Sequence, residues 1–330
     1  MTHWRRLPGD DLERSYGMTS TAGASFETID SGFHSHGTRC AARIYRPSVT
    51  EPVPVIVMAH GFGGVRTVRL PAYAETFAAA GYAVVLFDYR YFGDSDGQPR
   101  QLLDIDSQLD DWRSAVKWAR NLPGIDASRV VGWGTSFAGG HVLTIGAEGD
   151  EFAAVIAQVP HTSGVAALRA AGLRASMRLL PKALHDSWRA LRRGEPIYVN
   201  SVGVAGSVAV MTAPGADDGV ERMYAESGVR RDSRVETVAA RVVLRVGLYS
   251  PGRRAARITC PTLIQVATDD NIAPARSAKK AAALIRSSTF RSYLGGHFSP
   301  YVSPLFESVI ADQLTFLRKV VPTRVLGPGR

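Results

Sequence analysis

The chain has 330 residues, of which 45% are hydrophobic and 21% are charged. This composition is typical of a globular protein with a substantial core, and it excludes a disordered or fibrous chain. No apolar run reaches the roughly 18–20 residues that a membrane-spanning helix needs, so we expect no membrane span. The first 18 residues carry three arginines but no apolar stretch follows them, so no secretory signal is predicted.

The two cysteines, Cys40 and Cys260, are too few for a disulfide framework, which makes the cytoplasm the simplest location. The net charge is +9, and most of the excess lies between His161 and Cys260, where 16 Lys and Arg residues stand against 8 Asp and Glu residues, a net of +8. No nucleic-acid-binding motif accompanies this basic segment, so we expect no nucleic-acid partner.

The chain alternates between strand-like and helix-like segments. Residues 1–24 are polar and predict a loose N-terminal arm. The next predicted elements are strands at 25–30, 38–47, 53–59, 82–90, 128–134 and 152–160, with helices at 69–82, 105–122 and 137–149. The run "VPVIVMA" at 53–59 is continuously apolar, as expected for a strand buried on both faces. We therefore predict an α/β fold with a mostly parallel central sheet and helices on both faces.

The alternation stops over residues 161–255, where basic amphipathic helices are predicted. It resumes with strands at 261–268 and 289–295 and helices at 274–287 and 304–320. This pattern predicts a core made of residues 25–160 and 256–320, a helical cap inserted at 161–255, and a tail at 321–330. We expect most apolar side chains of the cap to pack on the core and on each other, namely Leu168, Leu173, Leu179, Leu180, Trp188 and Leu191.

Ser136 stands in a short turn, "GTSFA", between a predicted strand and a predicted helix. A strand, a tight turn and a helix around G-x-S-x-G form a nucleophile elbow, which holds the serine hydroxyl above the sheet. Here the last position is Ala138, one methyl group larger than glycine. The motif alone does not separate a nucleophile from a serine that caps the helix.

A serine nucleophile needs a base and an acid that orients the base. His297 lies in the loop "GGHF" after the last predicted strand, and "ATDDNIAP" supplies Asp269 and Asp270 after the preceding strand. Function collects at the carboxyl ends of parallel strands, so these groups are expected to meet. We favour Asp270, four residues before Pro274, with Asp269 as the alternative.

The loop "HGFGG" follows the strand at 53–59 and predicts an oxyanion hole. We assign its two donors to the backbone N–H groups of Phe62 and Phe137. His60 is predicted to hydrogen-bond within this loop and to lie near the pocket. His161, where the cap begins, is a second candidate for the pocket wall.

These motifs, "HGFGG", "DYRYFGDSDG", "GTSFAGG", "DDNIAP" and "GGHF", resemble in order and spacing those of α/β-hydrolase serine hydrolases. Within that superfamily, the chain is similar to dienelactone-hydrolase-like and acetyl-xylan-esterase-like enzymes with an inserted cap. The resemblance covers about 25–160 and 258–320. It implies a Ser136–His297–Asp270 triad that needs no cofactor or metal.

We therefore expect a serine esterase that cleaves carboxylic esters of small-molecule substrates. One alternative is a thioesterase or acyltransferase acting on a carrier-linked acyl group, for which the basic cap would attract an anionic substrate. Another alternative is a hydrolase-fold binding protein without catalysis. The sequence does not decide between a monomer and a homodimer.

Overall fold

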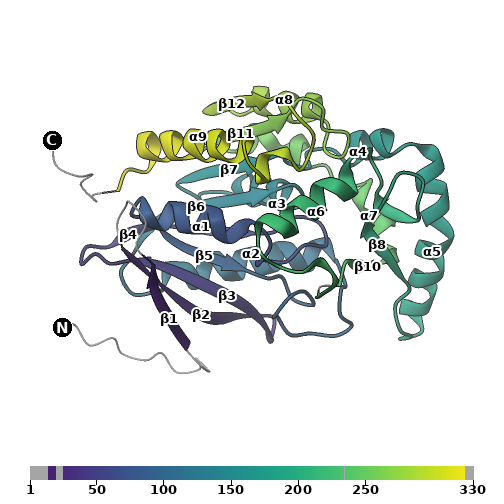
Figure 1. The fold of residues 1–330 in the computed structure, drawn as a ribbon, viewed down its shortest axis with the longest axis horizontal. Helices are drawn as coiled ribbons and strands as arrows, with labels where there is room; N and C mark the ends of the chain where they lie inside the picture. The colour runs from purple at the N-terminus through teal and green to yellow at the C-terminus, as the bar shows by residue number, and fades with distance from the viewer. Residues whose placement is uncertain (1–13, 20–24, 234, 324–330) are drawn as a thin grey trace.

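The structure is a computed structural model that describes residues 14–19, 25–233 and 235–323 (Figure 1). The described residues form a nine-stranded sheet in the order β1-β2-β3-β5-β4-β6-β7-β11-β12. Its strands are β1 (Arg14–Thr19), β2 (Phe26–Ser35), β3 (Thr38–Pro47), β4 (Val53–Ala59), β5 (Ala83–Phe87), β6 (Ile125–Thr135), β7 (Ala154–Gln158), β11 (Thr262–Ala267) and β12 (Ser288–Tyr293). The first four strands in this order pair antiparallel, and the strands from β5 to β12 pair parallel.

Helices cover both faces of this sheet, as predicted. They are α1 (Leu70–Ala79), α2 (Ile105–Arg120), α3 (Phe137–Gly146), α8 (Ala275–Leu284) and α9 (Leu305–Val320). Apolar residues of α2, α3 and α8 belong to one buried cluster, and those of α1 and α9 belong to another. The two clusters lie on opposite faces of the sheet. The expected α/β fold is confirmed.

Strand β4 shows why the sequence forms this sandwich. All seven of its residues are buried. Val55 and Val57 belong to the cluster with α2 and α3, whereas Ile56 and Met58 belong to the cluster with α1 and α9. Because successive side chains of a strand point to opposite faces, a continuous apolar run supplies both clusters.

The two ends of the chain differ from their predictions where the structure describes them. Residues 14–19, expected in a loose arm, form β1, which pairs antiparallel with β2. The rest of the predicted arm, 1–13 and 20–24, lies outside the described residues. Of the predicted tail, Val321 is buried against α9 and accepts a hydrogen bond from the Tyr82 hydroxyl, and 324–330 lie outside the described residues.

The segment between β7 and β11 is built of helices and a second small sheet. Its helices are α4 (Gly164–Ala171), α5 (Leu173–Leu191), α6 (Ala216–Glu226) and α7 (Val243–Val246). Its strands β8 (Tyr198–Val202), β9 (Ala209–Met211) and β10 (Thr237–Ala239) pair in the order β10-β8-β9. We had expected a helical cap, but the cap also contains this three-stranded sheet. Elements α4, α5, α7 and β8 gather at one end of the molecule, and α5 forms its outer edge (Figure 1).

The expectation that the apolar side chains of the cap pack inward is wrong for most of them. Leu179 is buried. Four others are exposed, namely Leu168, Leu180, Trp188 and Leu191. An amphipathic pattern predicts that a helix has an apolar face, but it does not say how much of that face the rest of the protein covers.

Candidate active site

Ser136 lies at the sharp turn where β6 ends and α3 begins. Its backbone angles, φ 55° and ψ −115°, are unusual for a residue with a side chain, and strain of this kind concentrates at functional sites. A Cβ atom on Gly134 would lie 2.2 Å from the carbonyl oxygen of Ala138, so only glycine fits there. The Ser136 side chain makes no capping hydrogen bond to α3. The hydroxyl is therefore available for chemistry, and the capping alternative does not hold.

The structure brings Ser136, His297 and Asp270 into one hydrogen-bonded chain. His297 Nε2 lies 2.9 Å from Ser136 Oγ, and His297 Nδ1 lies 2.6 Å from Asp270 Oδ2. The Nδ1–H group donates to the carboxylate, which leaves Nε2 to accept the proton of the serine hydroxyl. The three side chains come from the carboxyl ends of β6, β11 and β12, as the topology requires.

Asp270, and not Asp269, occupies the position beside His297. Its second oxygen, Oδ1, accepts hydrogen bonds from the backbone N–H groups of Ile272 and Ala273, at 2.8 Å and 2.7 Å. These bonds fix the orientation of the carboxylate. Asp269 is exposed and pairs only through its backbone with Gly295 among the contacts described.

The Asp270–His297–Ser136 chain is largely withdrawn from water. Ser136 is 8% exposed, Asp270 5% and His297 4%. Charge interactions are stronger where water is excluded, so a carboxylate beside the imidazole stabilises a positive charge that forms on it. The arrangement can remove a proton from the Ser136 hydroxyl and hold that proton on His297.

The two predicted oxyanion donors, Phe62 and Phe137, lie side by side next to Ser136. Their rings pack edge to face with centroids 5.5 Å apart, and both residues line a cavity together with Ser136. Phe137 is the first residue of α3, where N–H groups have no acceptor within the helix. The loop that carries Phe62 comes close to the serine, because a Cβ on Gly61 would lie 2.9 Å from Ser136 Cβ.

A buried ion pair between Arg66 and Asp88 stabilises the loop that carries Phe62. Arg66 donates from its backbone to one oxygen of Asp88 and from its guanidinium to the other, at 2.7 Å and 2.5 Å. His60 Nδ1 lies 3.0 Å from the Gly61 carbonyl oxygen, consistent with the predicted loop hydrogen bond. Burial lowers the pKa of His60, so the ring is neutral near pH 7. Sequence reasoning missed Arg66 and Asp88, since only their contact reveals them.

His161 joins the cap to the elbow. Its backbone N–H donates to the Ser136 carbonyl oxygen at 2.8 Å, and its Nε2 lies 3.0 Å from the carbonyl oxygen of Tyr249. Its ring stacks on the Tyr249 ring with an interplanar angle of 6°. Burial lowers the pKa of His161 to about 4, so this residue is neutral at pH 7. Sequence reasoning also missed Tyr249, because no local pattern marks its contacts with His161.

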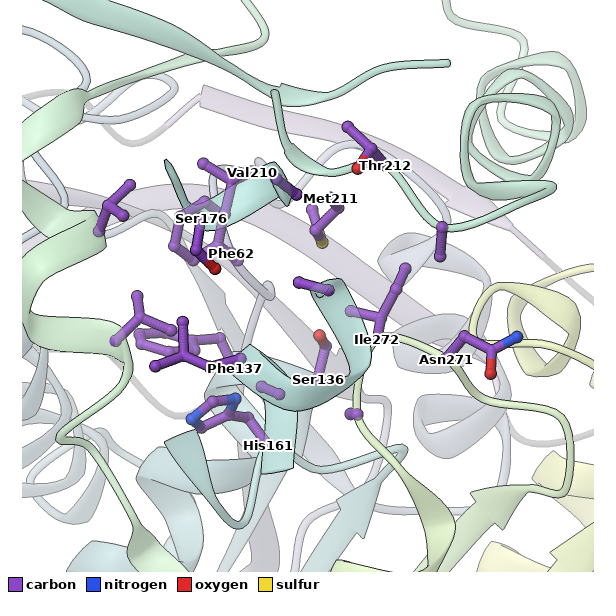
Figure 2. Close-up of a pocket in the computed structure, with 18 of the residues that line it drawn as sticks. Phe62, Ser136, Phe137, His161, Ser176, Val210, Met211, Thr212, Asn271 and Ile272 are labelled. Carbon is purple, nitrogen blue, oxygen red and sulfur yellow. The ribbon is translucent and has the colours of Figure 1, made fainter. Parts of the chain in front are cut away.

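Two cavities meet at Ser136. The first lies under the cap, and Figure 2 shows the Ser136 hydroxyl on the side where Met211 and Ile272 lie. Its lining carries no charged side chain and consists of Phe62, Ser136, Phe137, His161, Ala167, Leu168, Ala171, Ala175, Ser176, Leu179, Val210, Met211, Thr212, Ala213, Val243, Val246, Asn271, Ile272 and Ala273. The second cavity shares Phe62, Ser136 and Met211 with the first and is also lined by His60 and His297. Residues of the cap thus face the candidate nucleophile from above.

The described residues contain no group of three or more His, Cys, Asp or Glu side chains that could hold a metal ion. Among them there is also no helix that is long and apolar enough to cross a membrane.

Comparisons with known proteins place this chain in a family. Residues 36–273 match the X-Pro dipeptidyl-peptidase (S15) family. The quorum-quenching protein AidA of Acinetobacter baumannii is 43% identical over 297 residues, which cover 90% of this chain and 96% of that protein. A shorter match is the thiohydrolase aneE of Aspergillus aculeatus, 36% identical over 39% of this chain and 37% of its own length.

A solved structure gives the same fold. The α/β hydrolase GrgF from a Penicillium species superimposes with a TM-score of 0.75 at 22% identity, covering 90% of this chain and 99% of that chain. A curated protein named polyketide transferase grgF from the same genus is 30% identical over 47% of this chain and 51% of its own length. The chain belongs to the X-Pro dipeptidyl-peptidase (S15) family of α/β hydrolases.

Proposed function

We propose that this protein is a serine hydrolase that cleaves carboxylic esters through Ser136. The observation that carries the proposal is the continuous hydrogen-bonded chain from Asp270 through His297 to Ser136, which ends at a hydroxyl directed into an apolar cavity. A base within 3 Å of a strained, uncapped serine is the arrangement that nucleophilic catalysis requires.

In the proposed reaction, Ser136 Oγ attacks the ester carbonyl carbon while His297 Nε2 takes the hydroxyl proton. The amides of Phe62 and Phe137 donate hydrogen bonds to the oxyanion that forms. His297 then gives the proton to the leaving alcohol, and the acyl group stays on Ser136. A water molecule, deprotonated by His297, attacks the acyl-enzyme, releases the carboxylic acid and restores the serine.

The two cavities suggest how the ester lies across the site. The group that leaves must be within reach of His297, which lines the second cavity but not the first. We therefore assign the leaving alcohol to the second cavity and the acyl group to the first. Since the first cavity is lined without charged side chains, an uncharged and mainly apolar acyl group fits it best.

The site is poorly suited to an N-terminal dipeptide, despite the family's description. A dipeptidyl-peptidase must hold the ammonium group of its substrate, and a carboxylate is the natural partner for it. The first cavity offers none, and Glu236 in the second is already paired with Arg231 at 2.9 Å. Ester cleavage needs no such anchor.

A second candidate is acyl transfer or hydrolysis of a thioester, with the same residues in the same roles. It is favoured by the relatives named thiohydrolase and polyketide transferase, and by a second cavity that could hold an acceptor in place of water. The relative named quorum-quenching suggests an ester-bearing quorum signal as a physiological substrate to test. A binding protein without catalysis has no use for the strained serine and is the least supported reading.

The test is hydrolysis of p-nitrophenyl esters from acetate to palmitate by the wild type, Ser136→Ala and the matched surface variant Ser128→Ala. Ser128 is exposed and bonds only to Asp126 among the contacts described. We expect Ser136→Ala to lose about a millionfold in kcat, and Ser128→Ala to match the wild type. X-Pro p-nitroanilides and acyl thioesters are assayed in parallel.

Covalent labelling distinguishes the alternatives. A phosphonofluoridate should add one adduct to the wild type, located on the peptide that contains Ser136, and none to Ser136→Ala. Labelling with turnover of thioesters but not of oxygen esters would favour the second candidate. Equal ester turnover by the wild type and Ser136→Ala would refute Ser136 as the nucleophile, and an unlabelled, inactive wild type would refute the hydrolase proposal.

A further inference from the structure

Helix α5 carries a stripe of exposed apolar side chains. The stripe, called here the α5 stripe, consists of Met177, Leu180, Leu184, Trp188 and Leu191, each exposed by between 44% and 86%. Their spacing places them within less than a quarter of the helix circumference, over a length of about 21 Å. Scattered exposed leucines need no explanation, but a continuous stripe on one helix marks a contact surface.

The rest of the protein does not use the α5 stripe for its own packing. The helix is anchored through its opposite face, where Leu179, Ala183 and Asp186 are buried. The Asp186 carboxylate binds the backbone and guanidinium of Arg241 and the backbone N–H of Ile197. The helix is thus fixed by its inner face, and its outer apolar face remains open.

Cations accompany the stripe on the same helix. Along one flank of the stripe lie Arg174, Arg178, Arg189 and Lys182, between about 40° and 120° around the helix from the edge of the stripe. Arg192 follows the last turn with its guanidinium 3.9 Å from the Trp188 ring centroid. None of the five forms a salt bridge with a residue that the structure describes. The acidic residue of α5, Asp186, is already paired. The outer surface of this helix is therefore apolar and positively charged.

The charge decides which partner fits this surface. A second copy of the chain would place the same cations opposite one another, with no acidic side chain of α5 left to pair with them. A membrane surface that contains anionic lipids complements both properties, since its headgroups attract Arg and Lys while Trp and Leu enter the boundary with the acyl chains. We propose that α5 docks the protein on an anionic lipid surface, with the α5 stripe immersed in the interface.

This docking would place the candidate active site next to the bilayer. Ala175, Ser176 and Leu179 on the inner side of α5 line the cavity that contains Ser136. An apolar acyl substrate that partitions into lipid would be concentrated at the wall of that cavity. This consequence rests on the proposed function, whereas the docking itself does not.

The experiment is co-sedimentation of the full-length protein with vesicles, which has no catalytic readout. The vesicles are pure phosphatidylcholine or phosphatidylcholine with 30 mol% phosphatidylglycerol, in buffer of low and of high salt. The test variant is Leu184→Glu. Its matched control is Leu284→Glu on α8, because the two leucines are 54% and 53% exposed. Light scattering gives the oligomeric state of each protein, and circular dichroism checks that each variant is folded.

We expect the wild type and Leu284→Glu to bind the anionic vesicles, to leave them at high salt and to ignore pure phosphatidylcholine. Leu184→Glu should bind the anionic vesicles at least about tenfold more weakly, because it puts a carboxylate where a leucine enters the interface. A wild type that stays in the supernatant with anionic vesicles overturns the proposal. So does a wild-type dimer that Leu184→Glu converts to monomer, which would assign the α5 stripe to a second copy of the chain.

Discussion

The buried neutral state of His161 makes the stability of the fold depend on pH, and His161→Gln tests this. The ring is enclosed between Phe137 and Tyr249, with centroid distances of 5.1 Å and 5.8 Å, and burial lowers its pKa from 6.5 to about 4. The unfolded chain therefore binds a proton at a higher pH than the folded protein does. Stability falls as the pH drops below 6.5, and the loss is complete below about 4.

The size of the effect follows from the two pKa values of His161. At pH 5 the unfolded side chain is almost fully protonated and the folded one is mostly neutral, which separates the states by about 1.5 pKa units. At about 1.4 kcal/mol per unit, His161 removes about 2 kcal/mol of stability between pH 7 and pH 5. Glutamine does not titrate, and its amide can still donate to the Tyr249 carbonyl oxygen that His161 Nε2 contacts.

The assay is urea unfolding of the wild type and His161→Gln at pH 7 and pH 5. We expect the drop in unfolding free energy between the two values to be about 2 kcal/mol smaller in His161→Gln. An equal drop in the wild type and His161→Gln would show that His161 becomes charged in the folded protein without cost, and would refute the reasoning.

Three further predictions follow from the site. Asp270→Asn should lower kcat for p-nitrophenyl esters by about 10,000-fold, while Asp269→Asn stays near the wild type; equal losses would put the acid assignment in doubt. Gly134→Ala should give insoluble or unfolded protein, because its Cβ would lie 2.2 Å from a backbone carbonyl oxygen, and a cooperative wild-type melting curve would contradict this. Arg66→Met should cost about 3–5 kcal/mol in urea unfolding by leaving the buried Asp88 carboxylate without its guanidinium partner; a loss below 1 kcal/mol would mean that water reaches Asp88.

The sequence predicted the parts of the molecule in which local pattern and burial agree. Strand β4 has the predicted bounds because a continuous apolar run flanked by turn residues has few alternatives in the parallel part of the sheet. Strand β3, which pairs antiparallel, also has the predicted bounds. The elbow was recognisable because Gly134 and Ser136 are local signals. His297 and Asp270 followed from the topology, since both stand at carboxyl ends of strands.

The cap could not be predicted in the same way. The apolar segment 197–211 forms β8 and β9, but short apolar runs do not separate a strand from a helix. The exposure of Trp188 depends on what packs against α5, which no local pattern encodes. The spacing to Pro274 favoured Asp270, but Asp269 could be set aside only from the position of the His297 ring. The periodicity of apolar residues predicts the form of one helix or strand. The exposure of Trp188 and the partner of His297 depend instead on contacts between elements.

Hydrogen bonds connect both ends of the cap to the turn that carries Ser136 and to helix α3. Where the cap begins, the His161 amide holds the Ser136 carbonyl oxygen. Where it returns, Tyr249 accepts from His161 and from the Gly164 amide, and its hydroxyl lies 2.7 Å from His141 of α3. Moving these ends would break bonds that set the strained Ser136 backbone.

A change in the cap that preserves these bonds is confined to its middle. The middle contains α5 and β9, which line the first cavity with Ser176 and Met211 and which are not bonded to the elbow in the contacts described. Helix α5, which forms part of the wall of the first cavity, also carries the α5 stripe. A surface that binds the stripe would act on the wall of the cavity while leaving the geometry of Ser136 intact.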